Sequence, residues 1–193
     1  MCAAGKYNII YADPPWNFKV WGAKGMGRSP EKHYSTQSIG SLKKMNIPAI
    51  ADTNCILLMW ATFPCLEQAL QLGAAWGFTY KTVAFTWIKR NKSGNGIFMG
   101  LGYYTRANAE IVLLFTKGKP LKRVSKNVSQ VLESFRGRHS EKPSEIRRRI
   151  NRLFGPVPRI ELFARTMQGG SDDSYEGWDL FGNEAHRSIE LPE

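Results

Sequence analysis

The chain has 193 residues, of which 42% are hydrophobic and 22% charged, a composition that argues against global disorder and for one domain over residues 1–193. Its 27 Lys and Arg against 16 Asp and Glu give a net charge of +11, which favours a polyanionic partner. No apolar run approaches the ~18 residues of a transmembrane helix, and the start lacks the pattern of a signal peptide, so a membrane partner is not expected.

Short runs of β-branched and aromatic residues predict the strands. The first run, Tyr7 to Ala12, stops at Asp13-Pro14-Pro15, which reads as a rigid turn. The further strands, in chain order, are predicted at Cys55 to Trp60, Thr82 to Ile88, Ala109 to Thr116, Arg159 to Ala164 and Gly177 to Phe181, and a short one is allowed at Val128 to Leu132.

Helices are predicted between these strands. Ser38 to Ile50 is weakly helical, and Pro64 to Trp76 has apolar residues at helical spacing. A third helix runs from Pro143 to Phe154, with proline at its start. Strands that alternate with helices or long crossovers indicate an α/β fold with a mostly parallel sheet. In such sheets ligands bind beyond the carboxyl ends of the strands, which is where Asp13 lies.

Positive charge gathers in particular segments. Residues 101–150 carry 12 Lys and Arg and 4 Asp and Glu, a net +8. Loops at residues 17–35, 91–106 and 119–138 are expected to form a nucleic-acid face, and a solvated surface is the plain alternative. The candidate phosphate contacts are Lys24, Arg28, Lys122, Arg123, Lys126, Arg136 and Arg138.

The cysteines and histidines give no metal framework. Cys2, Cys55 and Cys65 lack C-x-x-C spacing and the three histidines are scattered, so we expect no metal site. An odd number of cysteines without a disulfide pattern suits a reducing compartment, and we expect a cytoplasmic protein.

The four residues Asp13-Pro14-Pro15-Trp16 carry the clearest chemistry. D-P-P alone is often only a turn, but here it follows an apolar strand and precedes a large aromatic residue. The Asp13 carboxylate and the Pro14 carbonyl can accept the two N–H groups of an exocyclic amine, and Pro15 fixes the loop that holds them. The Trp16 ring suits a flat base. Such acceptors free the lone pair of the N6 nitrogen of adenine to attack the methyl sulfonium of S-adenosylmethionine.

From Tyr7 to Glu184 the chain resembles the MT-A70 family of adenine-N6 methyltransferases, which act on RNA or DNA. The segments that carry the resemblance are YNIIYADPPW at 7–16, His33-Tyr34, LMWAT at 58–62, TWIK at 86–89, NAEIVLLFTKG at 108–118, HSEKPSE at 139–145, IELFAR at 160–165 and GWDLFGNE at 177–184. In this order they are highly specific. The resemblance implies a Rossmann-like methyltransferase fold with a seven-strand, mostly parallel sheet, permuted so that the catalytic motif precedes the cofactor-binding strand.

The resemblance also implies which residues bind the donor, S-adenosylmethionine. Asp13 would contact both the target amine and the donor's amino group, and Lys142 would neutralise the donor's carboxylate. Arg165, Asn183 and Glu184 would bind its ribose and nearby atoms. The plain alternatives are solvated charges and, at Gly182-Asn183, a simple turn. Larger relatives have a segment before the catalytic strand that helps bind the donor's adenine, and only six residues precede Tyr7 here.

A second set of residues is implied to hold the target base. Trp16 and Tyr34 would sandwich or abut a flipped adenine, and Glu110 would line its pocket. Core packing is the alternative for any single aromatic residue, and we interpret Trp60 and Trp87 as core or pocket floor.

The substrate is predicted to be DNA, with the target adenine flipped out of the stack. This preference over RNA rests on the resemblance, because compact members resemble bacterial or phage DNA-modifying enzymes. An RNA adenine-N6 methyltransferase, a catalytically silent nucleic-acid-binding partner subunit, and a protein or small-amine methyltransferase are the alternatives. Either a monomer or a homodimer fits the sequence.

Overall fold

The computed structural model describes residues 6–17, 37–137, 141–165, 172–185 and 189–192. Several sequence predictions lie outside these ranges: nearly all of the 17–35 loop with Lys24, Arg28 and Tyr34, and also Arg138.

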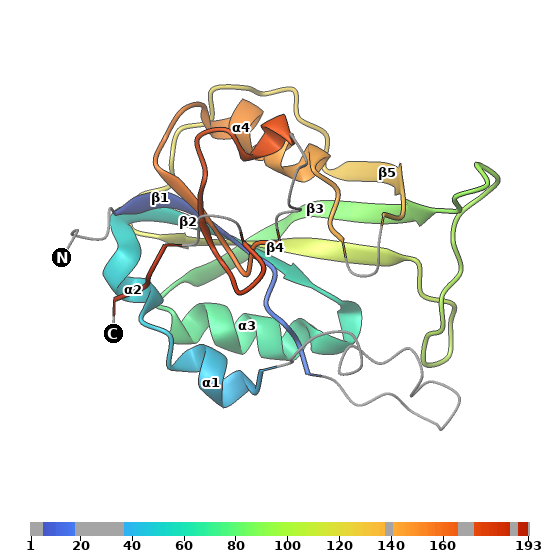
Figure 1. Cartoon of the computed structure of the whole chain (residues 1–193), viewed down its shortest axis with the longest axis horizontal. Coiled ribbons are helices and arrows are strands. Elements are labelled where there is room, and N and C mark those ends of the chain that lie inside the picture. The colour runs from blue at the N-terminus through green and yellow to red at the C-terminus, as the bar shows by residue number, and fades with distance from the viewer. Residues whose placement is uncertain (1–5, 18–36, 138–140, 166–171, 186–188, 193) are drawn as a thin grey trace.

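A seven-stranded sheet with the order β5-β3-β4-β2-β1-β6-β7 forms the centre of the structure (Figure 1). Strand β4 pairs antiparallel with both of its neighbours, β2 and β3, whereas the other four pairings are parallel. The expected mostly parallel α/β sheet is therefore confirmed, with β4 as its one reversed strand. The strands are β1 (Tyr7–Ala12), β2 (Ala51–Ala61), β3 (Thr79–Arg90), β4 (Ala109–Lys117), β5 (Val131–Phe135), β6 (Arg159–Leu162) and β7 (Asp179–Phe181).

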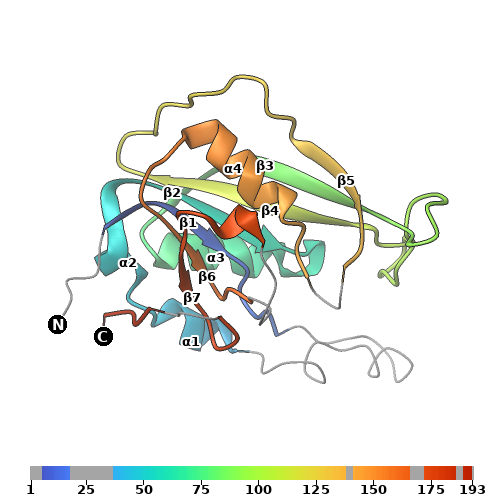
Figure 2. The same cartoon turned by 45° about the horizontal axis from the view of Figure 1, so that its top comes forward.

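Helices cover both faces of the sheet. Helices α1 (Ile39–Lys43) and α3 (Leu66–Ala75) lie on one side, and α4 (Glu145–Phe154) lies on the other (Figures 1 and 2). The short helix α2 (Ile47–Ile50) leads into β2, and the 3-10 turns η3 (Phe63–Cys65) and η4 (Asp173–Tyr175) precede α3 and β7. Within the described residues, no helix is long and apolar enough to cross a membrane.

The central strands are buried on both faces, which explains why they read as continuous apolar runs. In β1, Ile10 and Ala12 pack into the cluster under α1 and α3, whereas Ile9 and Tyr11 pack into the cluster under α4. Strand β2 alternates in the same way, since side chains in a strand point to opposite faces in turn. At a helix–sheet contact, Gly73 of α3 lies against the Phe115 ring, where a built Cβ would stand 2.3 Å from the ring.

The structure moves several predicted boundaries. The predicted helix from Ser38 to Ile50 is split into α1 and α2, because Ser38 caps the first and Pro48 opens the second. Strand β2 starts four residues before the apolar run, at Ala51, because the polar residues Asp52, Thr53 and Asn54 that separate Ala51 from the run also belong to the strand. The short strand allowed at 128–132 forms at 131–135, where only Leu132 is buried, and so its sequence carries little apolar signal.

The sheet brings several sequence motifs to one edge. Strands β1, β2 and β6 run in the same direction and end near Asp13, Thr62 and Arg165. Because β4 runs in the opposite direction, its first residues, including Glu110, lie at that same edge. This edge holds the candidate site.

Candidate active site

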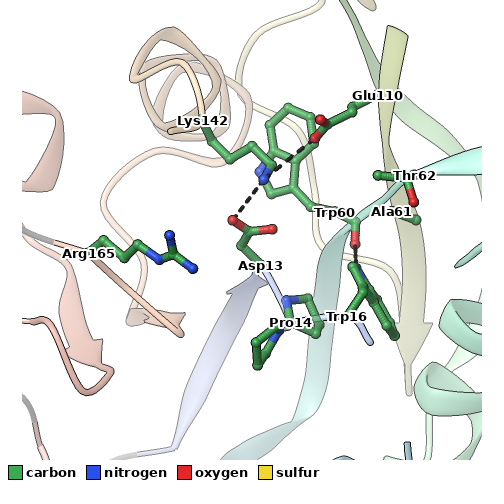
Figure 3. Close-up of a pocket in the computed structure, with 10 residues that line it drawn as sticks. Asp13, Pro14, Trp16, Trp60, Ala61, Thr62, Glu110, Lys142 and Arg165 are labelled. Atoms are coloured by element: carbon green, nitrogen blue, oxygen red, sulfur yellow. Dashed lines mark hydrogen bonds and ion pairs between the residues drawn. The ribbon is translucent and has the colours of Figure 1, made fainter. Parts of the chain in front are cut away.

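A pocket opens at the carboxyl edge of β1 and β2 (Figure 3). The Asp-Pro-Pro-Trp segment forms one wall, and residues from β2, β4, the segment before α4 and the segment after β6 complete it. Its lining residues are Asp13, Pro14, Pro15, Trp16, Trp60, Ala61, Thr62, Glu110, Lys142 and Arg165.

A chain of charged side chains crosses the pocket. The Nζ atom of Lys142 lies 2.9 Å from Oδ2 of Asp13 and 3.5 Å from Oε2 of Glu110. Glu110 also forms an ion pair with Lys89, at the end of β3. These four side chains are mostly buried, from 11% exposed for Lys142 to 19% for Asp13 and Lys89. The pairing of opposite charges is what allows them to lie away from bulk water.

The two carboxylates of this chain differ in their affinity for protons. Burial raises the pKa of Asp13 above its usual value, and Lys142 acts in the opposite direction without cancelling the effect. Burial acts on Glu110 as well, but Lys142 and Lys89 together outweigh it and hold the pKa of Glu110 below its usual value. Glu110 therefore stays ionised, whereas Asp13 has the stronger tendency to bind a proton.

Two hydrogen bonds of Trp16 help to fix the conformation of the Asp-Pro-Pro-Trp segment. The Trp16 backbone N–H donates to the Pro14 carbonyl at 2.8 Å, and the Trp16 indole Nε1–H donates to the Trp60 carbonyl at 3.0 Å. Trp16 is only 6% exposed, so these bonds and its packing fix the ring against the end of β2. The Pro14 carbonyl has two lone pairs, of which the Trp16 N–H occupies one.

Arg165 lines the pocket on the opposite side of Asp13 from Glu110, Thr62 and Trp16 (Figure 3). The backbone turns at Phe163, whose φ of 62° is unusual for a bulky residue, and Arg165 then pairs with Glu184 through a parallel bridge. Gly182 permits this approach, because a built Cβ would stand 2.4 Å from the Ala164 carbonyl oxygen.

The structure brings most of the predicted site residues together. Asp13, Pro14, Pro15, Trp16, Glu110, Lys142 and Arg165 all line the pocket. Glu184 is exposed beside Arg165 rather than in the lining, and Asn183 is exposed next to it. Trp60, interpreted from the sequence as core or pocket floor, is buried and lines the pocket beneath the Lys142 ammonium, 5.5 Å from the ring centroid.

The predicted phosphate contacts that the structure describes lie at two different ends of the sheet. Arg136 follows β5 at the pocket edge and stacks on the Phe98 ring at 3.6 Å. The segment with Lys122, Arg123 and Lys126 leaves the far end of β4, where the Lys119 N–H donates to Asn54 and the Val124 N–H donates to Leu153. The structure does not bring this segment to the pocket.

The connection between β3 and β4, residues 91–108, projects beyond the sheet (Figures 1 and 2). Residues 91–106 of this connection are predicted from the sequence as one of the loops of the nucleic-acid face. Its exposed side chains include five large apolar or aromatic residues but only two basic ones, Lys92 and Arg106, and Tyr104 and Tyr103 are 93% and 75% exposed. Its surface is therefore less basic than that of the 119–138 segment.

Three residues at the site were not predicted from the sequence. Ala61 and Thr62 line the pocket, and Lys89 lies behind it, paired with Glu110. All three lie at the ends of strands, inside the LMWAT and TWIK motifs. The rule that ligands bind beyond strand ends provides the signal that finds them. Within the described ranges, no group of three or more His, Cys, Asp or Glu side chains is arranged to hold a metal ion.

Comparison with known proteins shows the family of the chain. The profile of the MT-A70 family matches residues 7–184. The chain belongs to the MT-A70 family. It is 37% identical to the type II methyltransferase M.MunI of Mycoplasma sp. over 204 residues, which cover 97% of this chain and 82% of that protein.

Two longer relatives are more distant. The putative N(6)-adenosine-methyltransferase MT-A70-like of Medicago truncatula is 28% identical over 183 residues, covering 93% of this chain and 26% of that protein. The N(6)-adenosine-methyltransferase catalytic subunit METTL3 of Homo sapiens is 28% identical over 162 residues, covering 83% of this chain and 26% of that protein. The chain thus spans about a quarter of these two relatives, and it is a member of a methyltransferase family, as its sequence predicted.

Proposed function

We propose that this chain transfers a methyl group from S-adenosylmethionine to the N6 amine of adenine in nucleic acid, with DNA as the favoured substrate. The observation that carries the proposal is the position of Asp13. It is a mostly buried carboxylate paired with Lys142, in a pocket that also holds the Trp16 ring and the Pro14 turn. The relatives named as N(6)-adenosine-methyltransferases support adenine as the base.

The residues around Asp13 fit a donor of this chemistry. When bound, S-adenosylmethionine supplies a methyl group on a sulfonium, whose sulfur keeps the electron pair of the broken S–C bond. We assign Asp13 to the donor's amino group, Lys142 to its carboxylate, and the Arg165 side of the pocket, with Asn183 and Glu184, to its ribose. Lys142 has three N–H donors, so it serves the donor's carboxylate while it holds Asp13 and Glu110.

The chain's own groups activate the target amine. Oδ2 of Asp13 accepts from Lys142, which leaves Oδ1 to accept one N–H of the amine, and the second lone pair of the Pro14 carbonyl accepts the other. Two such acceptors localise the nitrogen lone pair that is otherwise delocalised into the ring. The amine loses one proton when the N–C bond forms, and Oδ1 of Asp13 is placed to hold it, since burial raises the pKa of this carboxyl.

DNA is favoured over RNA on the degree of sequence similarity. The chain is 37% identical to the type II methyltransferase M.MunI and 28% identical to METTL3. This agrees with the resemblance of compact members to DNA-modifying enzymes. A base in a duplex reaches the pocket only by flipping, at a cost of a few kcal/mol.

Methyl incorporation from labelled donor tests the proposal. Duplex DNA, single-stranded DNA and RNA are each incubated with the protein, and the nucleosides are identified by mass spectrometry. We expect N6-methyladenine in DNA. N6-methyladenine in RNA alone overturns the DNA assignment and keeps the chemistry, whereas methylated cytosine or methylated protein overturns the assignment of the pocket.

Donor binding separates an enzyme from a catalytically silent nucleic-acid-binding subunit. Calorimetry with S-adenosylmethionine alone is expected to show binding that Lys142→Met weakens. No binding by the wild-type protein, together with retained binding of nucleic acid, favours the silent subunit.

Salt dependence locates the nucleic-acid face. If Arg136 contacts a phosphate, Arg136→Gln is expected to lower the slope of log K against log salt by about one unit. Lys126→Gln is the matched control at the far end of the sheet, and we expect its slope to stay unchanged because its segment lies away from the pocket. A lower slope for Lys126→Gln together with an unchanged slope for Arg136→Gln would place the nucleic-acid face at the 119–126 segment instead.

A further inference from the structure

The connection between β3 and β4, residues 91–108, forms an arm that carries an unusual share of exposed apolar side chains (Figures 1 and 2). Ten large apolar side chains are exposed among the described residues, and five of them belong to this β3–β4 arm. The five are Ile97, Met99, Leu101, Tyr103 and Tyr104. Single exposed apolar residues need no explanation, but a group of them marks an interaction surface.

Hydrogen bonds hold the backbone of the β3–β4 arm in place. The Phe98 N–H donates to the Lys89 carbonyl at 2.8 Å, and the Gly100 N–H donates to the Ala107 carbonyl at 2.7 Å. Gly102 permits the tight turn at the tip, because any Cβ at this position would collide with a backbone carbonyl across the turn. The exposed side chains are therefore presented from an ordered backbone, which reduces the entropy lost when a ligand binds to them.

The charges of the β3–β4 arm favour a polyanion as its partner. Residues 91–108 contain no Asp or Glu, and both of their basic side chains, Lys92 and Arg106, are exposed. At the base of the arm the Arg136 guanidinium stacks on the Phe98 ring at 3.6 Å. A second copy of this chain, which has a net charge of +11, would bring these cations together with others of the same sign.

The two tyrosine rings at the tip of the arm suit the flat face of a base. The Tyr103 and Tyr104 ring centroids are 4.9 Å apart and the ring planes are 89° apart, so the rings meet edge to face. Tyr104 is 93% exposed, which leaves its ring open to a flat ligand. Aromatic rings next to cations are the pattern by which proteins bind unpaired nucleotides, because every base has a face on which a ring stacks.

Both ends of the β3–β4 arm adjoin the candidate active site. The arm begins shortly after Lys89 and ends shortly before Glu110, and these two side chains form an ion pair at the pocket. Arg136, which contacts Phe98 of the arm, lies on the segment that leads to Lys142. A polynucleotide whose target base enters the pocket is therefore placed to pass the arm.

We propose that the β3–β4 arm binds unpaired nucleotides next to the target adenine, and that Tyr104 stacks on one of their bases. This inference rests on the proposed function, to which it adds a binding surface outside the pocket. It also gives a reason for the composition of the arm: a surface that binds bases needs fewer cations than one that binds phosphates.

Photo-crosslinking tests which residues contact the neighbouring bases. Single-stranded DNA oligonucleotides with one adenine carry 5-iodouracil at each flanking position in turn, and each is irradiated in complex with the protein. Mass spectrometry then identifies the crosslinked residue. We expect crosslinks to Tyr104 or Tyr103 from one or two positions near the adenine. The absence of any crosslink to residues 91–108 overturns the inference.

Affinity for the same oligonucleotide separates stacking from charge. Tyr104→Ala is expected to raise Kd by about 5- to 100-fold and to leave the slope of log K against log salt unchanged, because the ring contacts no phosphate. Tyr104→Phe keeps the ring and is expected to bind as the wild type does. Tyr80→Ala removes an exposed tyrosine at the opposite end of β3 and is the matched control. Equal Kd values for the wild type and Tyr104→Ala contradict the inference.

Sedimentation velocity distinguishes a protein partner from a nucleic acid. A dimeric wild type, together with a monomeric Tyr104→Ala that keeps the wild-type affinity for the oligonucleotide, would make the arm an interface between copies and overturn the inference.

The two proposals fail separately. If the proposed function is wrong, the wild type forms no N6-methyladenine on any polynucleotide. If only the role of the β3–β4 arm is wrong, the wild type methylates adenine, and Tyr104→Ala binds and methylates the oligonucleotide as the wild type does.

Discussion

Two networks of buried charge lie close to strand β1, and they differ in what surrounds them. The pocket network joins Asp13, Lys142, Glu110 and Lys89 at the carboxyl edge of the sheet. The Arg147 network, between α4 and β6, joins Arg147 to Glu161, Asp172 and Ser174, with the Arg147 guanidinium stacked on the Tyr175 ring at 3.8 Å.

The Arg147 network is closed by protein. Arg147 and Glu161 have side chains 6% and 8% exposed, and the guanidinium bonds to Ser174 at 2.8 Å and to Asp172 at 3.0 Å. Three residues of the pocket network, Asp13, Glu110 and Lys142, face a cavity. Paired charges alone therefore do not identify a functional site, because structural ion pairs perturb pKa values as well. What distinguishes the pocket network is its access to a ligand.

The largest expected difference between the two networks is in turnover. Asp13→Ala removes the carboxylate that we assign to the target amine, and we expect kcat to fall by at least about 1000-fold with the fold intact. Glu161→Gln keeps the size of a buried carboxyl and is expected to leave kcat within about threefold. Methyl incorporation at saturating donor and target measures both, and near-normal turnover by Asp13→Ala removes the assignment.

Stability is expected to show the opposite ranking. Arg147→Met leaves Glu161 buried without its cation, and we expect the free energy of unfolding to fall by about 3–5 kcal/mol. Lys142→Met is expected to cost about 1 kcal/mol, since Glu110 keeps Lys89 and Asp13 faces the cavity rather than the closed interior. Urea unfolding compares the two variants. Equal losses would mean that both networks are structural.

The pH dependence of stability sharpens the account of the Arg147 network. Burial raises the pKa of Glu161 from 4.5 to about 7, so the folded protein binds a proton there that the unfolded chain has released. The contribution of Glu161 to the free energy of unfolding is therefore lost as the pH rises from about 4.5 to about 7, by up to about 3 kcal/mol. Glu161→Gln is expected to lack this component, which urea unfolding at pH 5 and pH 8 measures. If the free energies of unfolding of the wild type and Glu161→Gln change with pH in the same way, Glu161 is not the source of this pH dependence.

The pH dependence of turnover sharpens the account of the pocket network. Methyl transfer needs ionised Asp13, so kcat is expected to fall as the pH drops through the pKa of this carboxyl. Lys142 lowers that pKa, and Lys142→Met therefore moves the acid limb of the profile to higher pH. Lys126→Met is the matched control and keeps the wild-type limb. If the acid limb of the kcat profile stays in place in Lys142→Met, it does not report the pKa of Asp13.

The strands and the catalytic motif were predictable because they depend on local patterns. The apolar runs around β1, β2 and β4 and the Asp13 to Trp16 segment can be read directly from the sequence. The reversal of β4 was not predicted, although it is this reversal that brings Glu110 to Asp13. Long-range pairing of strands has no local sequence signal.

The burial of Arg147 was also beyond a local reading. Arg147, in the run of three arginines at 147–149, reads as part of a basic surface patch, yet its partners on β6 and η4 bury it. The deciding contacts of Arg147 come from segments distant in sequence.

The most direct test of the central claim is to observe the two buried carboxyl groups while the target binds. Carbon-13 NMR of the Asp13 and Glu161 side-chain carboxyls is recorded with and without an adenine-containing DNA oligonucleotide. The account predicts that the Asp13 resonance and its titration midpoint shift on binding, whereas those of Glu161, which interacts with Asp13 only through space, shift much less. A shift at Glu161 without one at Asp13 would contradict the assignment of the pocket network to the target amine.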